Sequence, residues 1–227
     1  MLCSGSIQIP IRDRVAAGQA LVPLLSDYRC RSDAIVLALP RGGVPVAYEV
    51  ATALELPLDL MLVRKLGVPA HRELAMGAIA SGGVRVVNRD VVSMHGIDDA
   101  TLDAEVARES LELQRREQAY RGMRPAPDLR ERVVILVDDG LATGATMLAA
   151  VRAARQQGAA RIVVAVPVGP DDTVAELQEE ADEVICPFQP EWFTAIGRWY
   201  VDFCQVMDQT VIDLLQRAWR LEQQRQG

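Results

Sequence analysis

Cysteines are few in this sequence and far apart. The four are Cys3, Cys30, Cys186 and Cys204, and no two of them form a C-x-x-C pair. Protein metal cages and disulfide frameworks bring cysteines together at short, regular spacings. We therefore expect no metal site built from protein side chains and no disulfide scaffold. Reduced thiols, as in the cytoplasm, are the expected state.

Positive charge is also scarce. The 227 residues include 24 lysines and arginines against 31 aspartates and glutamates, so the formal net charge is −7. Broad binding to nucleic acid needs a basic surface, and this composition argues against it. A local basic pocket for an anionic small molecule remains compatible with the acidic balance. Lysine is nearly absent, since Lys65 is the only one in the chain.

Long apolar runs are missing as well. Half of the residues are hydrophobic, which is enough for a sizeable core. However, no run approaches the roughly 20 residues that span a membrane. The first residues also lack the basic segment, apolar stretch and cleavage site of a secretory signal. We therefore expect a cytoplasmic protein without a membrane partner, folded as one α/β domain with an elaboration.

The most informative stretch is residues 133–146. Residues 133–137 are apolar without a break, which is typical of a strand buried on both faces of a parallel sheet. Asp138 and Asp139 follow, then a turn of small residues and hydroxyls, then a helical pattern over 147–155. Ligands of open α/β sheets bind at the carboxyl ends of strands, and helix N-termini bind anions. The stretch thus pairs acceptors for hydroxyls with donors for a phosphate, as a sugar phosphate requires.

Three other interpretations explain this stretch less well. A P-loop requires G-x-x-x-x-G-K-[ST], and residues 140–146 have neither that glycine spacing nor the lysine. A haloacid-dehalogenase phosphatase also has an aspartate after a buried strand, but its second acid comes two residues later instead of one. An acidic turn that caps a helix would explain one aspartate and one threonine, but not the whole set.

Residues 138–146, Asp-Asp-Gly-Leu-Ala-Thr-Gly-Ala-Thr, resemble the fingerprint of the type I phosphoribosyltransferases. That fingerprint is two acids, two variable residues, a small residue, Thr-Gly, any residue and Thr. The resemblance implies that Asp138 and Asp139 bind the ribose hydroxyls of phosphoribosyl pyrophosphate (PRPP) and act in catalysis. It also implies that a loop holds the 5′-phosphate. The residues of that loop are Ala142, Thr143, Gly144, Ala145 and Thr146.

A second strand, turn and helix precede this motif. A buried strand over 34–39 ends in Pro-Arg-Gly-Gly, and a helical pattern follows. Glycines let the backbone approach a ligand closely, and a guanidinium suits phosphate oxygens. In the family, the loop after the first core strand binds pyrophosphate, so the resemblance implies that Arg41, Gly42 and Gly43 bind PRPP. The alternative is an ordinary glycine turn with a surface arginine.

The next predicted strand, Leu58 to Val63, ends in Arg-Lys-Leu-Gly. Residues 67–75 have the mixed polarity of a flexible lid, which in related enzymes closes over the reacting centre. Such a lid excludes water that would compete as a nucleophile. The resemblance implies that Lys65 assists the leaving pyrophosphate, whereas a solvated strand end is the alternative. A group of predicted phosphoribosyltransferases of unassigned base shares both the Pro-Arg-Gly-Gly and the Arg-Lys-Leu-Gly sequences.

The alternation of strands and helices predicts the α/β class, with a doubly wound parallel sheet of about five strands. We treat residues 1–227 as a single phosphoribosyltransferase domain. Its predicted parts are a core sheet over about 34–186, an insertion over about 78–123 and a C-terminal hood over about 187–227. The insertion is expected to contain a hairpin and a long charged helix, and that helix is a candidate dimer surface.

Both ends of the chain carry further predictions. A leading helix is expected within residues 11–28, with Arg12, Asp13 and Arg14 on its solvent side. Six of the ten aromatic residues lie between positions 188 and 203. In family members that use purines, an aromatic after the last core strand stacks on the base. Trp192 and Phe193 are the candidates here, and packing of the hood against the sheet is the alternative.

The resemblance implies a Mg²⁺-dependent transfer of the 5-phosphoribosyl group from PRPP to a nitrogen nucleophile, with release of pyrophosphate. Mg²⁺ would be held mainly through PRPP. The expected partners are PRPP, a small-molecule nucleophile such as a nucleobase, and a second copy of the chain in a homodimer. Two alternatives stay open. The fold also occurs in non-catalytic regulators that sense PRPP or nucleotides, and a hydrolase of sugar phosphates is the other possibility.

Overall fold

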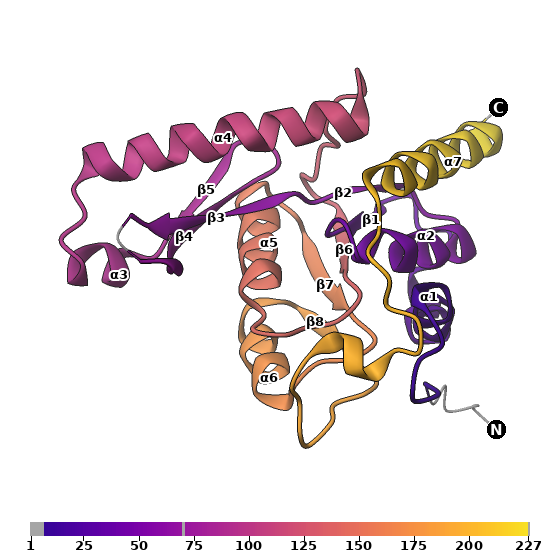
Figure 1. Cartoon of the computed structure of the whole chain (residues 1–227). Coiled ribbons are helices and arrows are strands. Elements are labelled where there is room, and N and C mark those ends of the chain that lie inside the picture. The colour runs from indigo at the N-terminus through magenta and orange to yellow at the C-terminus, as the bar shows by residue number, and fades with distance from the viewer. Residues whose placement is uncertain (1–6, 70, 227) are drawn as a thin grey trace.

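A parallel sheet of five strands forms the centre of the molecule (Figure 1). The structure is a computed structural model that describes residues 7–69 and 71–226, so Cys3 and Ala70 lie outside the described residues. The strand order is β2-β1-β6-β7-β8, and every pairing is parallel. The strands are β1 (Ala34–Ala38), β2 (Leu58–Leu60), β6 (Val133–Val137), β7 (Arg161–Ala165) and β8 (Glu183–Ile185). The predicted fold class is confirmed.

Helices cover both faces of this sheet (Figure 1). On one face lie α1 (Arg14–Leu21), α2 (Gly43–Leu54) and α7 (Asp208–Gln226), with a 3₁₀ segment, η1 (Val22–Tyr28), after α1. On the other face lie α5 (Ala145–Gln156) and α6 (Asp171–Glu180). The sheet is therefore doubly wound, as predicted.

The two buried faces explain the unbroken apolar runs of the core strands. Successive side chains of a strand point to opposite faces. In β1, Val36 joins the cluster that contains α2, whereas Ile35 and Leu37 join the cluster that contains α5. Every residue of β1 and β6 is buried. A strand with water on one face would alternate apolar and polar residues instead.

The predicted strand from Leu58 to Val63 is confirmed only as far as Leu60, and the predicted lid over 67–75 stays a prediction. The core strand β2 ends at Leu60, and β3 (Val63–Val68) belongs to a separate antiparallel sheet of order β3-β4-β5. Its other strands are β4 (His71–Ala80) and β5 (Val84–Val87), so the predicted lid lies mostly within β3 and β4. Leu66 and Val68 are buried in the cluster that includes Leu102 and Leu113 of the long helix. The last three residues of β3 are all buried, so this part of the predicted lid packs against the protein as a strand.

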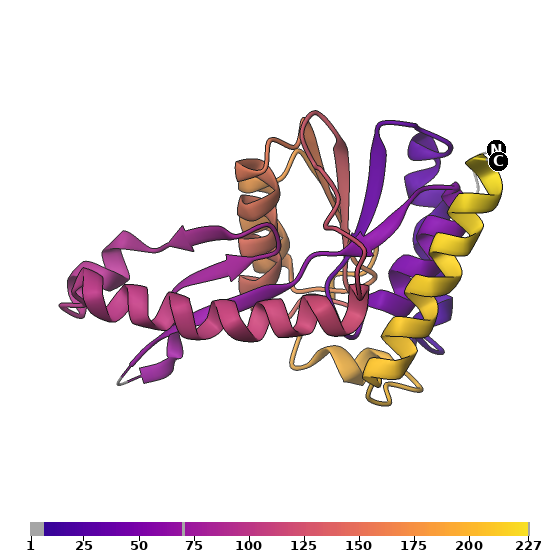
Figure 2. The same ribbon diagram turned by 90° about the horizontal axis from the view of Figure 1, so that it is seen from above.

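This second sheet and two helices form a lobe that projects from the side of the core (Figures 1 and 2). The helices are α3 (Arg89–Met94) and α4 (Asp99–Arg121), so the predicted hairpin and long helix are confirmed. The lobe begins at Val63, earlier than the predicted start near residue 78. At the end of α4, buried Arg121 donates from Nε to Asp59 Oδ1 at 2.6 Å and from Nη2 to the Leu60 carbonyl at 2.6 Å. These bonds tie the lobe to the end of β2.

The chain after β8 returns to the core in two parts. A loop with a short 3₁₀ segment, η2 (Ile196–Trp199), leads to Tyr200, which pairs with Ile11 near the N-terminus. The predicted final helix is confirmed as α7, and its buried residues Val211 and Leu215 belong to the core cluster that also includes α2. Within the described residues, none of the helices has the length and apolarity needed to cross a membrane. The division into core, insertion and hood stays a prediction.

Candidate active site

The acidic motif lies where the central strand β6 ends and α5 begins. Asp138 and the residues after Asp139, from Gly140 to Met147, line one cavity of about 150 Å³ together with Ile196. Ala142, Thr143, Gly144, Ala145 and Thr146 are all part of this wall. Gly144, at φ +68°, precedes the first turn of α5, and no described side chain caps the backbone N–H groups there. A helix N-terminus with free backbone donors favours an anion.

The two acids have different surroundings. Asp138 lines the cavity, and its Oδ1 accepts a hydrogen bond from the backbone N–H of Asp139 at 2.8 Å. Asp139 is only 7 % exposed, and its Oδ2 accepts from Nε of Arg14 at 2.8 Å. The hydroxyl of Tyr200 donates to the backbone carbonyl of Asp139 at 2.7 Å. Asp138 therefore faces the cavity, while Asp139 is held behind it.

These surroundings shift the pKa of both carboxyl groups. Burial, and then the neighbouring charge of Asp139, raise the pKa of Asp138 well above its usual value. Burial also raises the pKa of Asp139, and the guanidinium of Arg14 works against that rise. Two carboxylates this close in sequence and space disfavour a double negative charge. A ligand that brings cations or hydroxyl donors would therefore stabilise the ionised carboxylate of Asp138.

Arg14 is a site residue that sequence reasoning missed. The sequence prediction places it on the solvent side of the leading helix, and this is wrong. The guanidinium carbon lies 4.0 Å from the centroid of the Phe203 ring, and Nη1 donates to the Cys204 carbonyl at 2.7 Å. These partners and Asp139 are distant in sequence from Arg14, so no local pattern could have indicated the pairing.

The turn after β1 packs directly against the acids. A Cβ atom on Gly42 would lie 2.0 Å from Oδ2 of Asp139, and one on Gly43 would lie 2.6 Å from the Val137 carbonyl oxygen. A Cβ atom therefore has no room at Gly43 against the backbone at the end of β6, and at Gly42 it would displace the Asp139 side chain. The Pro40–Arg41 peptide is cis. The structure therefore brings the predicted Arg41–Gly42–Gly43 segment to the acidic motif.

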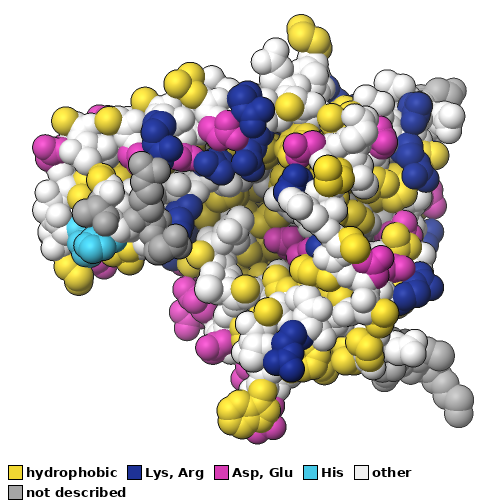
Figure 3. All heavy atoms as spheres, viewed as in Figure 1, with side chains coloured by type: hydrophobic (Ala, Val, Ile, Leu, Met, Phe, Trp, Pro, Cys, Tyr) yellow, Lys and Arg dark blue, Asp and Glu magenta, His cyan; other side chains and the backbone are white. Residues whose placement is uncertain are grey.

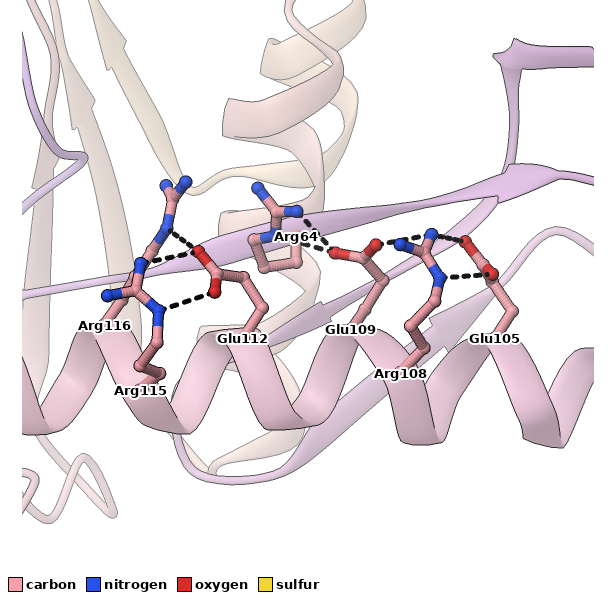
Figure 4. A network of polar contacts seen from close by, with 7 residues as sticks. All are labelled: Arg64, Glu105, Arg108, Glu109, Glu112, Arg115 and Arg116. Carbon is pink, nitrogen blue, oxygen red and sulfur yellow. Dashed lines mark hydrogen bonds and ion pairs between the residues drawn. The ribbon is translucent and has the colours of Figure 1, made fainter.

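Lys65 lies within β3 of the second sheet and not at the end of a core strand, where the sequence prediction places it. It is on β3 and lines a cavity of about 280 Å³ with other charged residues of β3 and α4, and it is absent from the residues that line the cavity at Asp138. On the same strand, Arg64 donates from Nε to Glu109 Oε2 at 2.8 Å, within a chain of ion pairs along α4 (Figure 4). Glu109 also pairs with Arg108 at 2.7 Å. Lys65 thus lies on a strand that is bonded to α4 through ion pairs.

The two aromatic candidates do not line the cavity at the motif. Trp192 is 80 % exposed, and Phe193 is partly buried against the core cluster. Ile196 lines that cavity instead, and a Cβ atom on Gly140 would lie 2.8 Å from its side chain. Sequence reasoning missed Ile196, because a lone isoleucine in a loop carries no recognisable pattern.

Acidic and basic side chains meet in a hollow between the lobe and the core (Figure 3). Among the described residues, no three His, Cys, Asp or Glu side chains are grouped so that they could hold a metal ion. Carboxylate acceptors and backbone donors at α5 are gathered at the end of β6, and the turn that carries Arg41 packs against them. This set can bind a polyol that carries phosphate groups.

Several known proteins are similar to this chain. The sequence model of the family described as phosphoribosyl transferase domain matches residues 24–203. A relative from Mycobacterium tuberculosis H37Rv, named provisionally as a phosphoribosyl transferase, is 49% identical over 208 residues, which are 92% of this chain and 47% of that protein. The same figures hold for the relative from strain CDC 1551 / Oshkosh. The chain thus spans about half the length of the curated relatives it matches.

Solved structures include similar chains. A crystal structure from Thermus thermophilus is 42% identical and covers 91% of this chain and 98% of its own, with a TM-score of 0.82. A purine phosphoribosyltransferase from Pyrococcus horikoshii is more remote, with 19% identity over 86% of this chain and 93% of its own and a TM-score of 0.45. The first of these shares the fold over 91% of this chain.

Proposed function

The chain belongs to the phosphoribosyl transferase family, and we propose that it transfers the 5-phosphoribosyl group of PRPP to a nitrogen nucleophile, with release of pyrophosphate. The observation that carries this proposal is the single cavity that joins Asp138 to the loop of residues 142–146 at the N-terminus of α5. A carboxylate and a phosphate-binding loop on one wall suit the two ends of a ribose 5-phosphate.

In the proposed reaction, the nucleophile attacks C1 of the ribose while the bond from C1 to pyrophosphate breaks. The electron pair of that bond leaves with pyrophosphate, and positive charge develops on the ribose ring. Asp138 accepts hydrogen bonds from the ribose hydroxyls and stabilises this charge. Backbone N–H groups of residues 142–146 and the hydroxyls of Thr143 and Thr146 hold the 5′-phosphate. Binding energy remote from C1 then orients the reacting centre.

Asp139 has a supporting part in this proposal. Its carboxylate is bound to Arg14 at 2.8 Å, so it meets the ribose only if it shares that contact with the ligand. Arg41, which lies beside the acids through the Gly42 contact, binds the pyrophosphate group. Lys65 is proposed to bind the same pyrophosphate group. This role requires β3 and the acidic motif to approach each other when PRPP binds.

Mg²⁺ fits this site as an ion held mainly by the substrate. The cavity at the motif has one acidic side chain in its wall, Asp138, and no group of three potential protein ligands occurs in the described part of the chain. Mg²⁺ commonly keeps several waters and binds through one or two carboxylates and substrate phosphates. When bound, it would neutralise charge that develops on the leaving pyrophosphate.

The nucleophile is proposed to be a nucleobase, and Trp192 or Phe193 would stack on it. The exposure of Trp192 leaves its ring available for such a contact, whereas Phe193 already packs on the core. A cytoplasmic location and a homodimer also stay predictions.

The test is calorimetry with PRPP and Mg²⁺, followed by a screen of nucleobases for pyrophosphate release. We expect the wild type to bind PRPP and the Asp138→Asn/Asp139→Asn variant to bind it at least about 100-fold more weakly, since two charge-assisted acceptors are lost. Asp103→Asn/Asp128→Asn is the matched control, because both of these carboxylates are exposed and paired with arginines on the surface.

Undiminished PRPP affinity in the Asp138→Asn/Asp139→Asn variant would overturn the assignment of the motif. PRPP binding by the wild type without pyrophosphate release for any base would instead favour a non-catalytic sensor. Release of inorganic phosphate from sugar phosphates would favour a hydrolase.

A further inference from the structure

Three elements that are distant in sequence enclose a second small cavity beside the acidic motif. Its volume is about 170 Å³, and its wall consists of Arg41, Arg115, Arg116, Ala119, Tyr120 and Asp208. Arg41 comes from the turn after β1, the next four residues from α4, and Asp208 from the start of α7. Because one water occupies about 30 Å³ in the liquid, the cavity has room for a group of several heavy atoms such as a phosphoryl group.

The wall of this cavity is rich in unshared donors. Glu112 accepts from Nε and Nη2 of Arg115, at 2.8 and 3.0 Å, and from Nε of Arg116 at 2.8 Å (Figure 4). One carboxylate therefore serves two guanidinium groups, each of which has five N–H bonds. Among the described residues, no other acceptor is bonded to the terminal nitrogens of Arg116. Both side chains can still donate to a ligand.

Asp208 supplies the only carboxylate among the residues of the cavity wall. It accepts a hydrogen bond from the hydroxyl of Tyr120 at 2.5 Å and lies 3.6 Å from Nη1 of Arg41. Burial and the charge of Asp208 raise the pKa of Tyr120 to about 12, so the phenol is a donor at neutral pH. The Asp208 side chain is 65 % exposed, so it can turn toward solvent without breaking the core.

The cavity adjoins the proposed ribose site. Arg41 is followed directly by Gly42, whose Cα leaves no room for a Cβ beside Oδ2 of Asp139. Basic side chains also gather along the rim of the hollow on its α4 side (Figure 3). An anionic group attached to the ribose at C1 would therefore meet Arg41 first and the guanidinium groups of α4 next.

We propose that Arg115 and Arg116 of α4 form, together with Arg41 and Tyr120, the binding site for the diphosphate group of PRPP, and that Asp208 competes with that group for the same donors. The inference rests on the proposed function and deepens it, because it assigns to the inserted helix part of the charge that stabilises the leaving group. Three permanently charged guanidinium groups against Asp208 and Glu112 leave a net positive cavity. Displacement of Asp208 makes it more positive, as a diphosphate requires.

The test uses inorganic pyrophosphate as the probe, with calorimetry on the whole chain. We expect Arg115→Ala/Arg116→Ala to weaken pyrophosphate binding by about 100-fold, since two charge-assisted hydrogen-bonding groups are lost. PRPP binding should weaken as well, and pyrophosphate should compete with PRPP. Asp208→Asn keeps an acceptor for Tyr120 but removes the competing charge, so pyrophosphate should bind about 10-fold more tightly. A damaged fold would not tighten binding.

The matched control is Arg152→Ala/Arg155→Ala, which removes the same two charges from α5, where they pair with Glu180 and Asp182. It should bind pyrophosphate as the wild type does. Unchanged pyrophosphate affinity in Arg115→Ala/Arg116→Ala, or pyrophosphate that does not compete with PRPP, would overturn the inference. The protein could also bind pyrophosphate through these arginines without binding PRPP. That result would support the anion-binding cavity and contradict the proposed function.

Discussion

Arg14 holds the second acid of the motif, with its Nε 2.8 Å from Oδ2 of Asp139 and with only 12 % and 10 % of the two side chains exposed. Arg14 precedes the segment that matches the family, which begins at residue 24. The ion pair gives the two acids of the motif different surroundings. Asp139 has a cationic partner of its own, and Asp138 remains as the acid that faces the cavity. The N-terminal helix α1 therefore contributes a direct side-chain partner to the acidic motif.

Arg14→Ala should lower the free energy of unfolding by about 3 kcal/mol at neutral pH, because it leaves the buried carboxylate of Asp139 without its partner. The variant also raises the pKa of Asp139 further in the folded state. The loss should therefore be largest above that raised pKa and should shrink as the pH falls toward the ordinary aspartate value of about 3.9. Urea unfolding between pH 4 and pH 8 measures this difference.

Arg12→Ala is the control for this prediction. Arg12 is exposed and pairs with its neighbour Asp13, so its loss should cost much less stability than the loss of Arg14. Arg14→Met/Asp139→Asn should regain part of the stability, since it removes both charges. A loss of equal size at every pH would instead assign the effect to packing of Arg14 on Phe203.

Asp138→Asn should raise the melting temperature at neutral pH while it abolishes PRPP binding. The folded-state pKa of Asp138 lies above the unfolded value, so the folded protein binds the proton more tightly. Wild-type stability therefore falls as the pH rises from the unfolded pKa through the folded one, and asparagine lacks this loss. The amide oxygen can still accept from the N–H of Asp139.

Melting temperatures measured from pH 4 to pH 8 test whether Asp138→Asn is more stable than the wild type at neutral pH. The variant and the wild type should converge at the acid end of the range. Asp128→Asn serves as the control and should show no gain, because Arg130 lowers the pKa of Asp128 to about 2. A variant at Asp138 that is less stable than the wild type at pH 7 would contradict the prediction.

Gly42→Ala should weaken PRPP binding by at least about 10-fold through a steric effect on Asp139. The backbone at Gly42, with φ −61° and ψ −36°, suits alanine, so no strain is expected there. The added Cβ would lie 2.0 Å from Oδ2 and 2.6 Å from Cγ of Asp139, which must then move away from Arg14. Calorimetry with PRPP and Mg²⁺ measures the effect.

Gly83→Ala is the control for Gly42→Ala, because it strains the backbone without a steric contact. Gly83 has φ +75° in the turn between β4 and β5, and a Cβ there would meet no atom within 4 Å. It should cost about 1 kcal/mol of stability through backbone strain and leave PRPP affinity unchanged. If Gly42→Ala bound PRPP as tightly as the wild type does, the prediction that the turn after β1 contributes to the PRPP site would be contradicted.

Local patterns predicted much of the core. The apolar runs at 34–38 and 133–137 are strands buried on both faces, and such runs depend only on neighbouring residues. The motif was recognisable for the same reason, since its acids and its loop are contiguous in the chain. Residues 142–146 line one cavity with Asp138 as a direct consequence of that order.

The Arg-Lys-Leu-Gly segment shows where local patterns failed. The apolar residues Leu58 to Val63 indicate one strand, yet β2 ends at Leu60 and β3 turns into another sheet. The decisive contacts come from α4, whose residue Arg121 bonds to Asp59 and the Leu60 carbonyl at the end of β2. A helix that follows about forty residues later in the chain cannot be read from the strand itself.

The sequence alone determined the alternation of strands and helices and the spacing of the acids from the loop of residues 142–146, because both are properties of adjacent residues. Only the tertiary structure decided that Arg14 meets Asp139, 125 residues away, and that Arg115 and Arg116 share a cavity with Arg41. Tertiary packing brings these segments together, and pairwise contacts across such distances leave no periodicity in the chain.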